Sequence, residues 1–299
     1  MTAVLQYKVV DVFSRHAFGG NPLAVFNHAP ALETRTMQAI ARQMNLSETV
    51  FVRPSADESC LAAYRIFTPA TELPTAGHPT IGATAVVLAE RFAADWPPTA
   101  VVELPVGPIA MHVEQRPGAD DHLVWMNQKV PMELAAPVAS PKRLLPALGL
   151  DLDDVAPDLE PAVLSVGLPI LIVPVRDEAT LERATPLGLA SFFAANPPVR
   201  VVYLVSEASS RADISARMFG GPAVGIEEDP ATGSAAGPLA AYLHRAGRLA
   251  AHREIVINQG HALGRSSFLH IRTDGSNVFV GGQVTEVANG ELTLDPRPM

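Results

Sequence analysis

The interpretation of this sequence depends on two short stretches, Glu72-Leu-Pro-Thr-Ala-Gly-His78 and Glu228-Asp-Pro-Ala-Thr-Gly-Ser234. Each places a Pro/Gly turn in front of an apolar run, Thr80–Leu88 in the first case and Ser234–Leu243 in the second. Both runs are apolar on every face, and a helix of that kind is buried on all sides. We therefore predict two central helices, each wrapped by the sheet of its own half of the chain.

The two turns belong to a weak internal duplication. Three pairs of segments match in the same order: Gly20–Phe26 with Gly167–Val173, Arg65–Phe67 with Arg217–Phe219, and the two Pro/Gly turns. The spacing between the copies grows through a short insertion, Gly220–Gly225. This pattern predicts two similar α/β halves, 1–130 and 131–299, with a last strand that could return to the first half.

Short β-branched runs bounded by turn residues predict the strands of both halves. The expected strands are Tyr7–Phe13, Leu23–Phe26, Thr49–Val52, Ala62–Phe67, Val163–Val173, Val199–Val205, Ile214–Phe219, Glu254–Ile257 and Phe268–Arg272. Between the second and third of them, Thr34–Met44 carries its apolar residues at the spacing of an amphipathic helix.

Composition narrows the class of protein. The chain has 299 residues, 48% of them hydrophobic, which is enough for two cores. The 22 Lys and Arg are outnumbered by 31 Asp and Glu, and no basic run stands out, so nucleic acid is not an expected partner. The most apolar window of the sequence is Ala162–Val175, which is too short to span a bilayer. The first residues lack the pattern of a signal peptide. A single cysteine, Cys60, excludes an intrachain disulfide. We expect a cytoplasmic protein without a membrane partner.

The two Pro/Gly turns are candidate anion sites. A helix N-terminus offers backbone N–H groups and a partial positive charge, and Gly77 and Gly233 let a ligand approach the backbone. The alternative is ordinary helix capping, with Thr or Ser as the cap and Pro79 as the first helical residue. Two such turns related by pseudo-symmetry can face each other across one cleft, which favours binding of a small carboxylate.

Three polar side chains are candidate site residues, two of them at the turns and one at the start of a strand. His78 lies inside the first turn and Asp229 just before the second. Glu48, within Asn45-Leu-Ser-Glu-Thr-Val-Phe51, is a carboxylate at the entry to an apolar strand, and its counterpart in the second half falls near Arg200. Each has an ordinary alternative: a structural donor for His78, a solvated acidic run for Asp229, and a capping-box or surface residue for Glu48.

Together these segments resemble the PhzF family, named for an isomerase of phenazine biosynthesis. The matching segments are Asp11-Val-Phe13, Gly20-Asn-Pro22, Asn45–Phe51, Arg65-Ile-Phe67, Glu72–Pro79, Glu228–Ala235 and Asn258-Gln-Gly260. They cover most of the chain in the family's order.

The resemblance implies a diaminopimelate-epimerase-like fold, in which two pseudo-symmetric halves each form a barrel-like mixed β-sheet around a central apolar helix. It also implies no cofactor, no metal and a homodimer. The catalytic residues that it implies are Glu48 as acid and base, His78 and Asp229. The substrate-binding residues are Asn21, Gly77, Gly233, Ser234 and Gln259.

The sequence departs from related patterns in two places. The epimerases with this fold use one cysteine in each Gly motif, whereas the turns here hold Ala76 and either Ala231 or Thr232, so a two-thiol mechanism is excluded. The segment Met218-Phe-Gly-Gly-Pro222 differs from typical members of the family and could line the pocket, which leaves the substrate open.

The hypothesis is a cofactor-independent isomerase or epimerase that moves a proton on a small carboxylated metabolite in a biosynthetic process. Glu48 would remove and return the proton, and burial beside Leu46, Val50 or Phe51 would supply the raised pKa that such a role needs. One alternative is a lyase or dehydratase that uses the same glutamate. Another is a non-catalytic protein that binds small acids or another protein. The nine histidines are scattered without metal-ligand spacing near the motifs, which disfavours a metalloenzyme.

Overall fold

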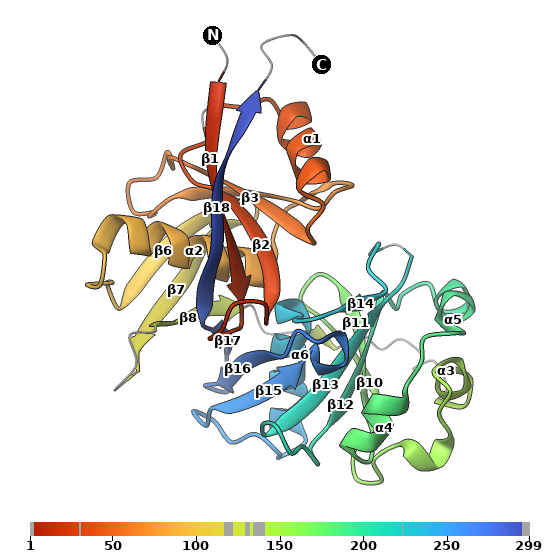
Figure 1. Ribbon diagram of the computed structural model, residues 1–299. Coiled ribbons are helices and arrows are strands. Elements are labelled where there is room, and N and C mark those ends of the chain that lie inside the picture. Colours follow the sequence, from red (N-terminus) through yellow and green to blue (C-terminus); the bar gives the residue numbers. More distant parts are fainter. Residues whose placement is uncertain are drawn as a thin grey trace. The chain divides into compact units, whose positions relative to one another are not determined.

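The computed structural model describes residues 3–29, 31–116, 122–128, 132–133, 141–222 and 224–294 (Figure 1). Contacts divide the chain into two compact units: unit 1 holds Met1–Asn127 and Gly281–Met299, and unit 2 holds Gln128–Val280. Whether the units are the separate domains 1–130 and 131–299 that the sequence predicts stays a prediction. None of the helices in the described ranges has the length and apolarity that a membrane crossing requires.

Unit 1 is a mixed sheet with two helices. Its helices are α1 (Thr34–Met44) and α2 (Gly77–Phe92). Its strands are β1 (Ala3–Val12), β2 (Asn21–Phe26), β3 (Glu48–Arg53), β4 (Ala63–Phe67), β5 (Glu72–Leu73), β6 (Thr99–Leu104), β7 (Gly107–Gln115), β8 (His122–Gln128) and β18 (Val284–Leu294). Figure 1 shows the blue β18 beside the red β1, and the two strands pair antiparallel along their length. The last strand of the chain is therefore hydrogen-bonded to the first.

Unit 2 adds more helices to a similar sheet. Its helices are α3 (Pro141–Ala147), α4 (Glu178–Arg183), α5 (Leu189–Ala195) and α6 (Gly233–Arg245), with 3-10 turns η1 (Leu152–Asp154) and η2 (His261–Leu263). Its strands are β9 (Met132–Glu133), β10 (Ala162–Ser165), β11 (Pro169–Pro174), β12 (Val201–Ser206), β13 (Ile214–Gly220), β14 (Glu228–Asp229), β15 (Ile255–Gln259) and β16 (Ser267–Thr273). Strand β17 (Val278–Gly282) runs across the point where the chain returns from unit 2 to unit 1.

The pattern of strand pairing in unit 1 recurs in unit 2. In unit 1, β2 pairs antiparallel with β1 and parallel with β3, β4 pairs antiparallel with β3 and β5, and β6 lies parallel to β4 and antiparallel to β7. Strands β10, β11, β12, β13, β14, β15 and β16 repeat these pairings in the same order and sense. In each unit the helix after the short fifth strand is the one that comes after the Pro/Gly turn. The duplicated motifs of the sequence thus occupy equivalent places in two sheets of one topology.

The central helices are buried as predicted. In α2 every residue of the segment 77–88 is buried, and the helix contacts β1, β2, β3, β4 and β18. The buried residues of α6 run from Gly233 to Leu243 with only Ser234 and Ala241 partly exposed, and the helix contacts β10, β11 and β16. Small residues make this close packing possible. A Cβ added at Gly82 would lie 2.7 Å from side-chain atoms of both Leu23 and Val12.

The opposite face of each sheet is covered by outer helices. In unit 1, Met37 and Ile40 of α1 pack on three phenylalanines, with ring centroids of Phe26 and Phe51 5.1 Å apart and those of Phe51 and Phe67 5.6 Å apart. In unit 2 a larger cluster joins α3, α4 and α5 to the sheet: Leu144, Leu145, Leu148, Leu181, Leu189, Phe192 and Phe193. The strands that lie between the central and outer helices, such as β2, β3, β11 and β12, are therefore buried on both faces and are almost continuous hydrophobic runs.

The sequence predictions are largely confirmed, with one clear error. Helix Thr34–Met44 is found with the predicted bounds, and all the other predicted strands of both halves are present within a few residues. The predicted strand Val163–Val173 is wrong as a single element. The chain reverses at Gly167, whose φ of +130° suits glycine, and Ser165 pairs with Pro169 to form an antiparallel hairpin. Strands β5, β6, β7, β8, β9, β14 and β17 were not predicted.

The contact between Gly82 and Leu23 gives a prediction about packing. Leu23→Ala should destabilise the protein by about 2–5 kcal/mol because a fully buried side chain is lost. Gly82→Ala gains about 1 kcal/mol in helix propensity but loses about 1–3 kcal/mol to overpacking. In the double variant the new methyl group occupies the vacated space, so the combined loss measured by urea unfolding should be smaller than the sum by at least about 0.5 kcal/mol.

The matched control is Gly107→Ala. Gly107 has a φ of +108° and its added Cβ would meet no atom within 4 Å, so its cost is backbone strain alone. Combined with Leu23→Ala, it should give an additive loss. Additivity of Gly82→Ala with Leu23→Ala would contradict the described packing of α2 on β1 and β2.

Candidate active site

An arginine–glutamate pair anchors the turn in front of each central helix. Arg65 donates to both carboxylate oxygens of Glu72, at 2.7 and 2.6 Å, and its guanidinium lies 5.3 Å from the ring centroid of Phe67. Arg217 donates in the same way to Glu228, at 2.8 Å for both bonds, and lies 4.8 Å from the ring of Phe219. Bidentate pairs of this kind fix geometry as well as charge. They tie β4 to β5 and β13 to β14, and so set where α2 and α6 begin.

Glu48 is placed by the end of α1. The helix stops at Asn45, which adopts the left-handed conformation with φ 52° and donates its N–H to Ala41. Three residues later Glu48 opens β3, opposite Leu23 of the parallel strand β2. Its side chain is only 12% exposed. The carboxylate predicted as the acid and base is therefore a nearly buried group on a rigid strand.

His78 meets Glu48 from the second residue of α2. The two side chains approach to 3.2 Å between His78 Nε2 and Glu48 Oε2, and the His78 side chain is 8% exposed. Although the distance is short, within the described part of the chain His78 Nε2 has no hydrogen bond of acceptable geometry. Burial lowers the pKa of His78 to about 3, so the ring is neutral at pH 7. A neutral imidazole can donate one hydrogen bond and accept another, and it places no positive charge beside the Glu48 carboxyl group.

Neither central helix begins with a side-chain cap. The N-cap of α2 is Ala76, which has no capping group, and Pro79 is the third helical residue. The N-cap of α6 is Thr232, but its side chain makes no capping hydrogen bond. The capping alternative, with Thr or Ser as the cap and Pro79 in the first position, is therefore wrong. The first-turn N–H groups at Gly77 and Gly233 are not occupied by a cap and keep the electrostatic preference for an anion.

In unit 2, Asp229 is held by its own turn. Asp229 is 5% exposed, and Thr232 donates its hydroxyl to Asp229 Oδ2 at 2.6 Å. Gln259, 1% exposed, donates from Nε2 to the Asp229 carbonyl at 2.7 Å and to Thr232 Oγ1 at 2.9 Å. Its Oε1 accepts from the Thr232 N–H at 3.2 Å and the Tyr203 hydroxyl at 3.0 Å. The four bonds use the whole capacity of the Gln259 amide.

The remaining predicted binding residues lie at strand and helix starts. Asn21 is fully buried as the first residue of β2 and pairs with Val12 of β1. Gly20 before it has φ +61°, and a Cβ there would collide with the backbone of Val12. Ser234 is half-buried in the first turn of α6. The roles of these residues in binding a substrate stay predictions.

The unusual segment Met218–Pro222 is explained partly by packing. Met218 pairs with Asp229 in the sheet, so it is the member of this segment that lies on the same rung as a predicted catalytic residue. Phe219 belongs to the outer core, and a Cβ on Gly221 would lie 3.0 Å from the ring of Phe193. Sequence reasoning missed Tyr203 and the side-chain bond of Thr232. The signal for Tyr203 was an aromatic hydroxyl within an otherwise aliphatic strand.

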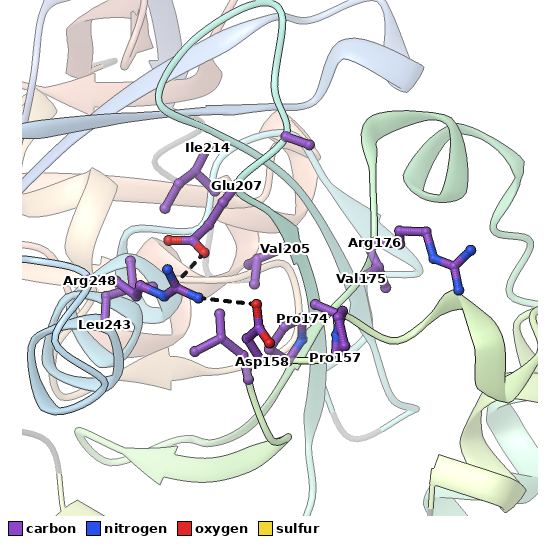
Figure 2. A pocket seen from close by; sticks show the side chains of 13 residues that line it. Pro157, Asp158, Pro174, Val175, Arg176, Val205, Glu207, Ile214, Leu243 and Arg248 are labelled. Carbon is purple, nitrogen blue, oxygen red and sulfur yellow. Dashed lines mark ion pairs between the residues drawn. The ribbon is translucent and has the colours of Figure 1, made fainter.

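A separate pocket on unit 2 contains none of the predicted site residues. Apolar side chains such as Val205, Ile214 and Leu243 line it, and Figure 2 shows Arg248 between Asp158 and Glu207. Each carboxylate lies 3.7 Å from the guanidinium, so the charges of the pocket offset one another. Among the described residues, no three His, Cys, Asp or Glu side chains gather in a group that could hold a metal ion.

The comparisons with known proteins point to one family. The PhzC-PhzF family, described as phenazine biosynthesis-like protein, matches residues 10–290. A trans-2,3-dihydro-3-hydroxyanthranilate isomerase of Pseudomonas aeruginosa is 35% identical to this chain, with 97% of this chain and 99% of that protein covered. The resemblance seen in the sequence motifs is thereby confirmed.

Solved structures agree on the fold. A PhzF-family phenazine biosynthesis protein of Bacillus anthracis matches with a TM-score of 0.86 at 23% identity, covering 97% of this chain and 99% of that one. A protein of Pseudomonas aeruginosa named as a predicted epimerase matches with a TM-score of 0.81 at 33% identity, covering 96% and 99%. The predicted α/β fold, a mixed sheet around a central helix in each half, is confirmed.

The burial of His78 predicts its behaviour with pH. Because burial lowers the pKa of His78 to about 3 from 6.5, the folded protein should keep the ring neutral from pH 8 to about 4.5. The unfolded chain binds this proton below pH 6.5, so stability falls as pH decreases toward 3. Between pH 7 and pH 5 the loss from this residue should be about 2 kcal/mol.

Two measurements check this expectation. NMR of the His78 ring, assigned by comparison with His78→Asn, should show neutral-imidazole shifts down to pH 4.5. Urea unfolding at pH 7 and pH 5 should show a smaller pH dependence for His78→Asn than for the wild-type protein. A ring that titrates near pH 6.5 would contradict the described burial.

Proposed function

The chain belongs to the PhzC-PhzF family of phenazine biosynthesis-like proteins, and on that premise we propose a cofactor-independent isomerase that moves a proton on a small carboxylated metabolite. The isomerase class expected from the sequence is confirmed by curated relatives that are named isomerases. The finer steps, with Glu48 as the proton carrier, are our proposal. The observation that carries it is the buried contact of Glu48 with the neutral His78.

Glu48 has the position that a proton carrier needs. It is a carboxyl group with little exposure, fixed at the start of a central strand rather than on a loop. Such a group can take a proton from an activated carbon and return it to the same or another carbon, and general acid–base catalysis of this kind contributes about 10²–10⁴-fold. The neutral His78 beside it can donate a hydrogen bond to a substrate heteroatom or accept one from it.

The two helix starts supply the proposed anchor for the substrate's carboxylate. Gly77 and Gly233 have no Cβ to keep a ligand from the backbone, and neither helix has a side-chain cap in the way. An anion at such N–H groups is stabilised by the helix dipole. Holding the carboxylate at the start of α2 would fix the reacting carbon relative to Glu48 of the same unit, and positioning of this kind can lower a barrier more than acid–base help alone.

Only one of the two repeats has a carboxylate at the position of the proposed base, Glu48. By strand register the position equivalent to Glu48 in unit 2 is Val201, since Glu48 pairs with Leu23 and Val201 pairs with the matching Ile170. The N-cap positions where relatives with two thiols would carry cysteine are Ala76 and Thr232. A single carboxyl that both removes and returns the proton favours transfer between two carbons of one substrate over inversion at one carbon.

The substrate class is proposed from the anchor and from a relative. The isomerase of Pseudomonas aeruginosa is named for trans-2,3-dihydro-3-hydroxyanthranilate, which is a small carboxylate with a hydroxyl group and an amine. We assign this chain a substrate of the same chemical class, with a carboxylate and at least one further heteroatom. Asp229 and His78 are the proposed partners of that heteroatom.

Glu48→Gln should abolish proton exchange with the substrate. The amide keeps the size of the side chain but cannot take up a proton, so turnover should fall by at least about 10²-fold while binding persists. The measurement is deuterium incorporation from D₂O, followed by NMR, across a panel of small hydroxylated and aminated carboxylic acids. Product analysis separates isomerisation from loss of a leaving group.

The matched control is Glu58→Gln, which makes the same change at an exposed residue and should leave exchange unchanged. If Glu48→Gln exchanged protons as fast as the wild-type protein, the proposed role of Glu48 would be wrong. If acids bound but none exchanged with the wild-type protein, a binding function would replace the proposed catalysis.

A further inference from the structure

Four buried polar side chains of unit 2 form one connected network at the start of α6. Tyr203, Gln259, Thr232 and Asp229 are each at most 5% exposed. They come from β12, β15, the N-cap of α6 and β14, and Tyr203 and Asp229 lie on one rung of the sheet because each pairs with Met218. With so little exposure, a donor or acceptor left without its partner would be destabilising.

The partners fix the direction of every hydrogen bond in this network. The Asp229 carbonyl can only accept, so it faces Gln259 Nε2, and the Thr232 N–H can only donate, so it faces Gln259 Oε1. Tyr203 must therefore donate to Oε1, and burial together with the charge of Asp229 raises the pKa of Tyr203, which keeps that proton in place. Gln259 Nε2 donates to Thr232 Oγ1. The Thr232 proton is then directed to Asp229 Oδ2.

The fold itself does not need this network. The repeated strand register identifies the equivalent position in unit 1 for each of its four members. These equivalents are all apolar: Val50, Leu73, Ala76 and Leu104. The same pairing of strands and the same helix start are thus built once with apolar residues at these four positions. Because buried polar networks are seldom more stable than apolar packing, a reason other than stability is needed for unit 2.

We infer that Tyr203 and Gln259 are positioning residues that act through Thr232 to hold the Asp229 carboxylate in one orientation for the substrate. The inference rests on the proposed function, in which Asp229 contacts the substrate. It assigns Gln259 a different task from direct substrate binding, because all four hydrogen-bonding positions of its amide are already used within unit 2. Tyr203 is the end of the relay, and its hydroxyl is linked to the Asp229 carboxylate through the hydrogen bonds of Gln259 and Thr232.

The test compares variants that change one hydrogen bond each. Thr232→Val removes the hydroxyl at nearly constant volume and should lower kcat at least about tenfold, with a smaller change in KM, since it removes the hydrogen bond from Thr232 that orients the Asp229 carboxylate. Thr232→Ser restores the hydroxyl and should recover most of that loss. Tyr203→Phe should lower kcat about threefold in the wild-type background and have no effect in the Thr232→Val background. That non-additivity is what a relay requires and what independent structural effects would not give.

A spectroscopic measurement tests the hydrogen-bond network independently of activity. The side-chain NH₂ group of Gln259, assigned by its loss in Gln259→Leu, has both protons hydrogen-bonded in the wild-type protein. In Thr232→Val one of the two proton signals should move upfield, and in Thr232→Ser it should not. If no acid shows exchange, the proposed function fails but this signal still supports or overturns the network.

Three results would overturn the inference. The first is equal kcat for Thr232→Val and wild type while Asp229→Asn is inactive. The second is full activity of Asp229→Asn, which would remove the residue that the relay serves. The third is an unchanged Gln259 NH₂ spectrum in Thr232→Val.

Discussion

The bidentate pairs Arg65–Glu72 and Arg217–Glu228 hold the central helix of each unit in place. Each pair ties the strand before the helix to the short strand that leads into it, and Arg217 also donates to the carbonyls of Leu181 and Ala184 at the end of α4. The pairs are half-buried or more, so water weakens them less than a surface ion pair. They fix the start of the helix, and with it the position of every residue in the turn.

One scaffold is used twice with its polar groups in different places. Unit 1 carries Glu48 and His78, where unit 2 has Val201 and Ser234 by register. Unit 2 carries the network around Asp229, where unit 1 is apolar. The apolar faces, the helix starts and the clamping arginines are retained in both. Duplication therefore supplies the frame, and the chemistry is added by a few substitutions at positions that the frame already holds rigid.

The sequence predicted the features that depend on short-range pattern. The repeat, the amphipathic α1 and the buried α2 and α6 are inferred from spacing and composition, and they are found as expected. The hairpin at Gly167 was missed because both of its strands are apolar and a single glycine hardly interrupts the run. The saturation of Gln259 could not be predicted, since its partners lie 27 to 56 residues away and meet it only through sheet register. Pattern locates a polar residue; only the register shows whether its hydrogen bonds are already made.

The side-chain oxygen of Thr232 could cap α6, but it is used in the hydrogen-bond network around Asp229 instead. As the N-cap of α6 its oxygen could accept a hydrogen bond from the first turn, an interaction worth about 0.5–2 kcal/mol. Instead that oxygen accepts a hydrogen bond from Gln259 and donates one to Asp229, and the first-turn N–H groups are left without a side-chain cap. In α2 the N-cap Ala76 reaches the same state by having no polar group at all. Both units thus lack a side-chain cap at the helix starts where we propose that an anion binds, and a bound carboxylate would supply the hydrogen bonds that the caps do not.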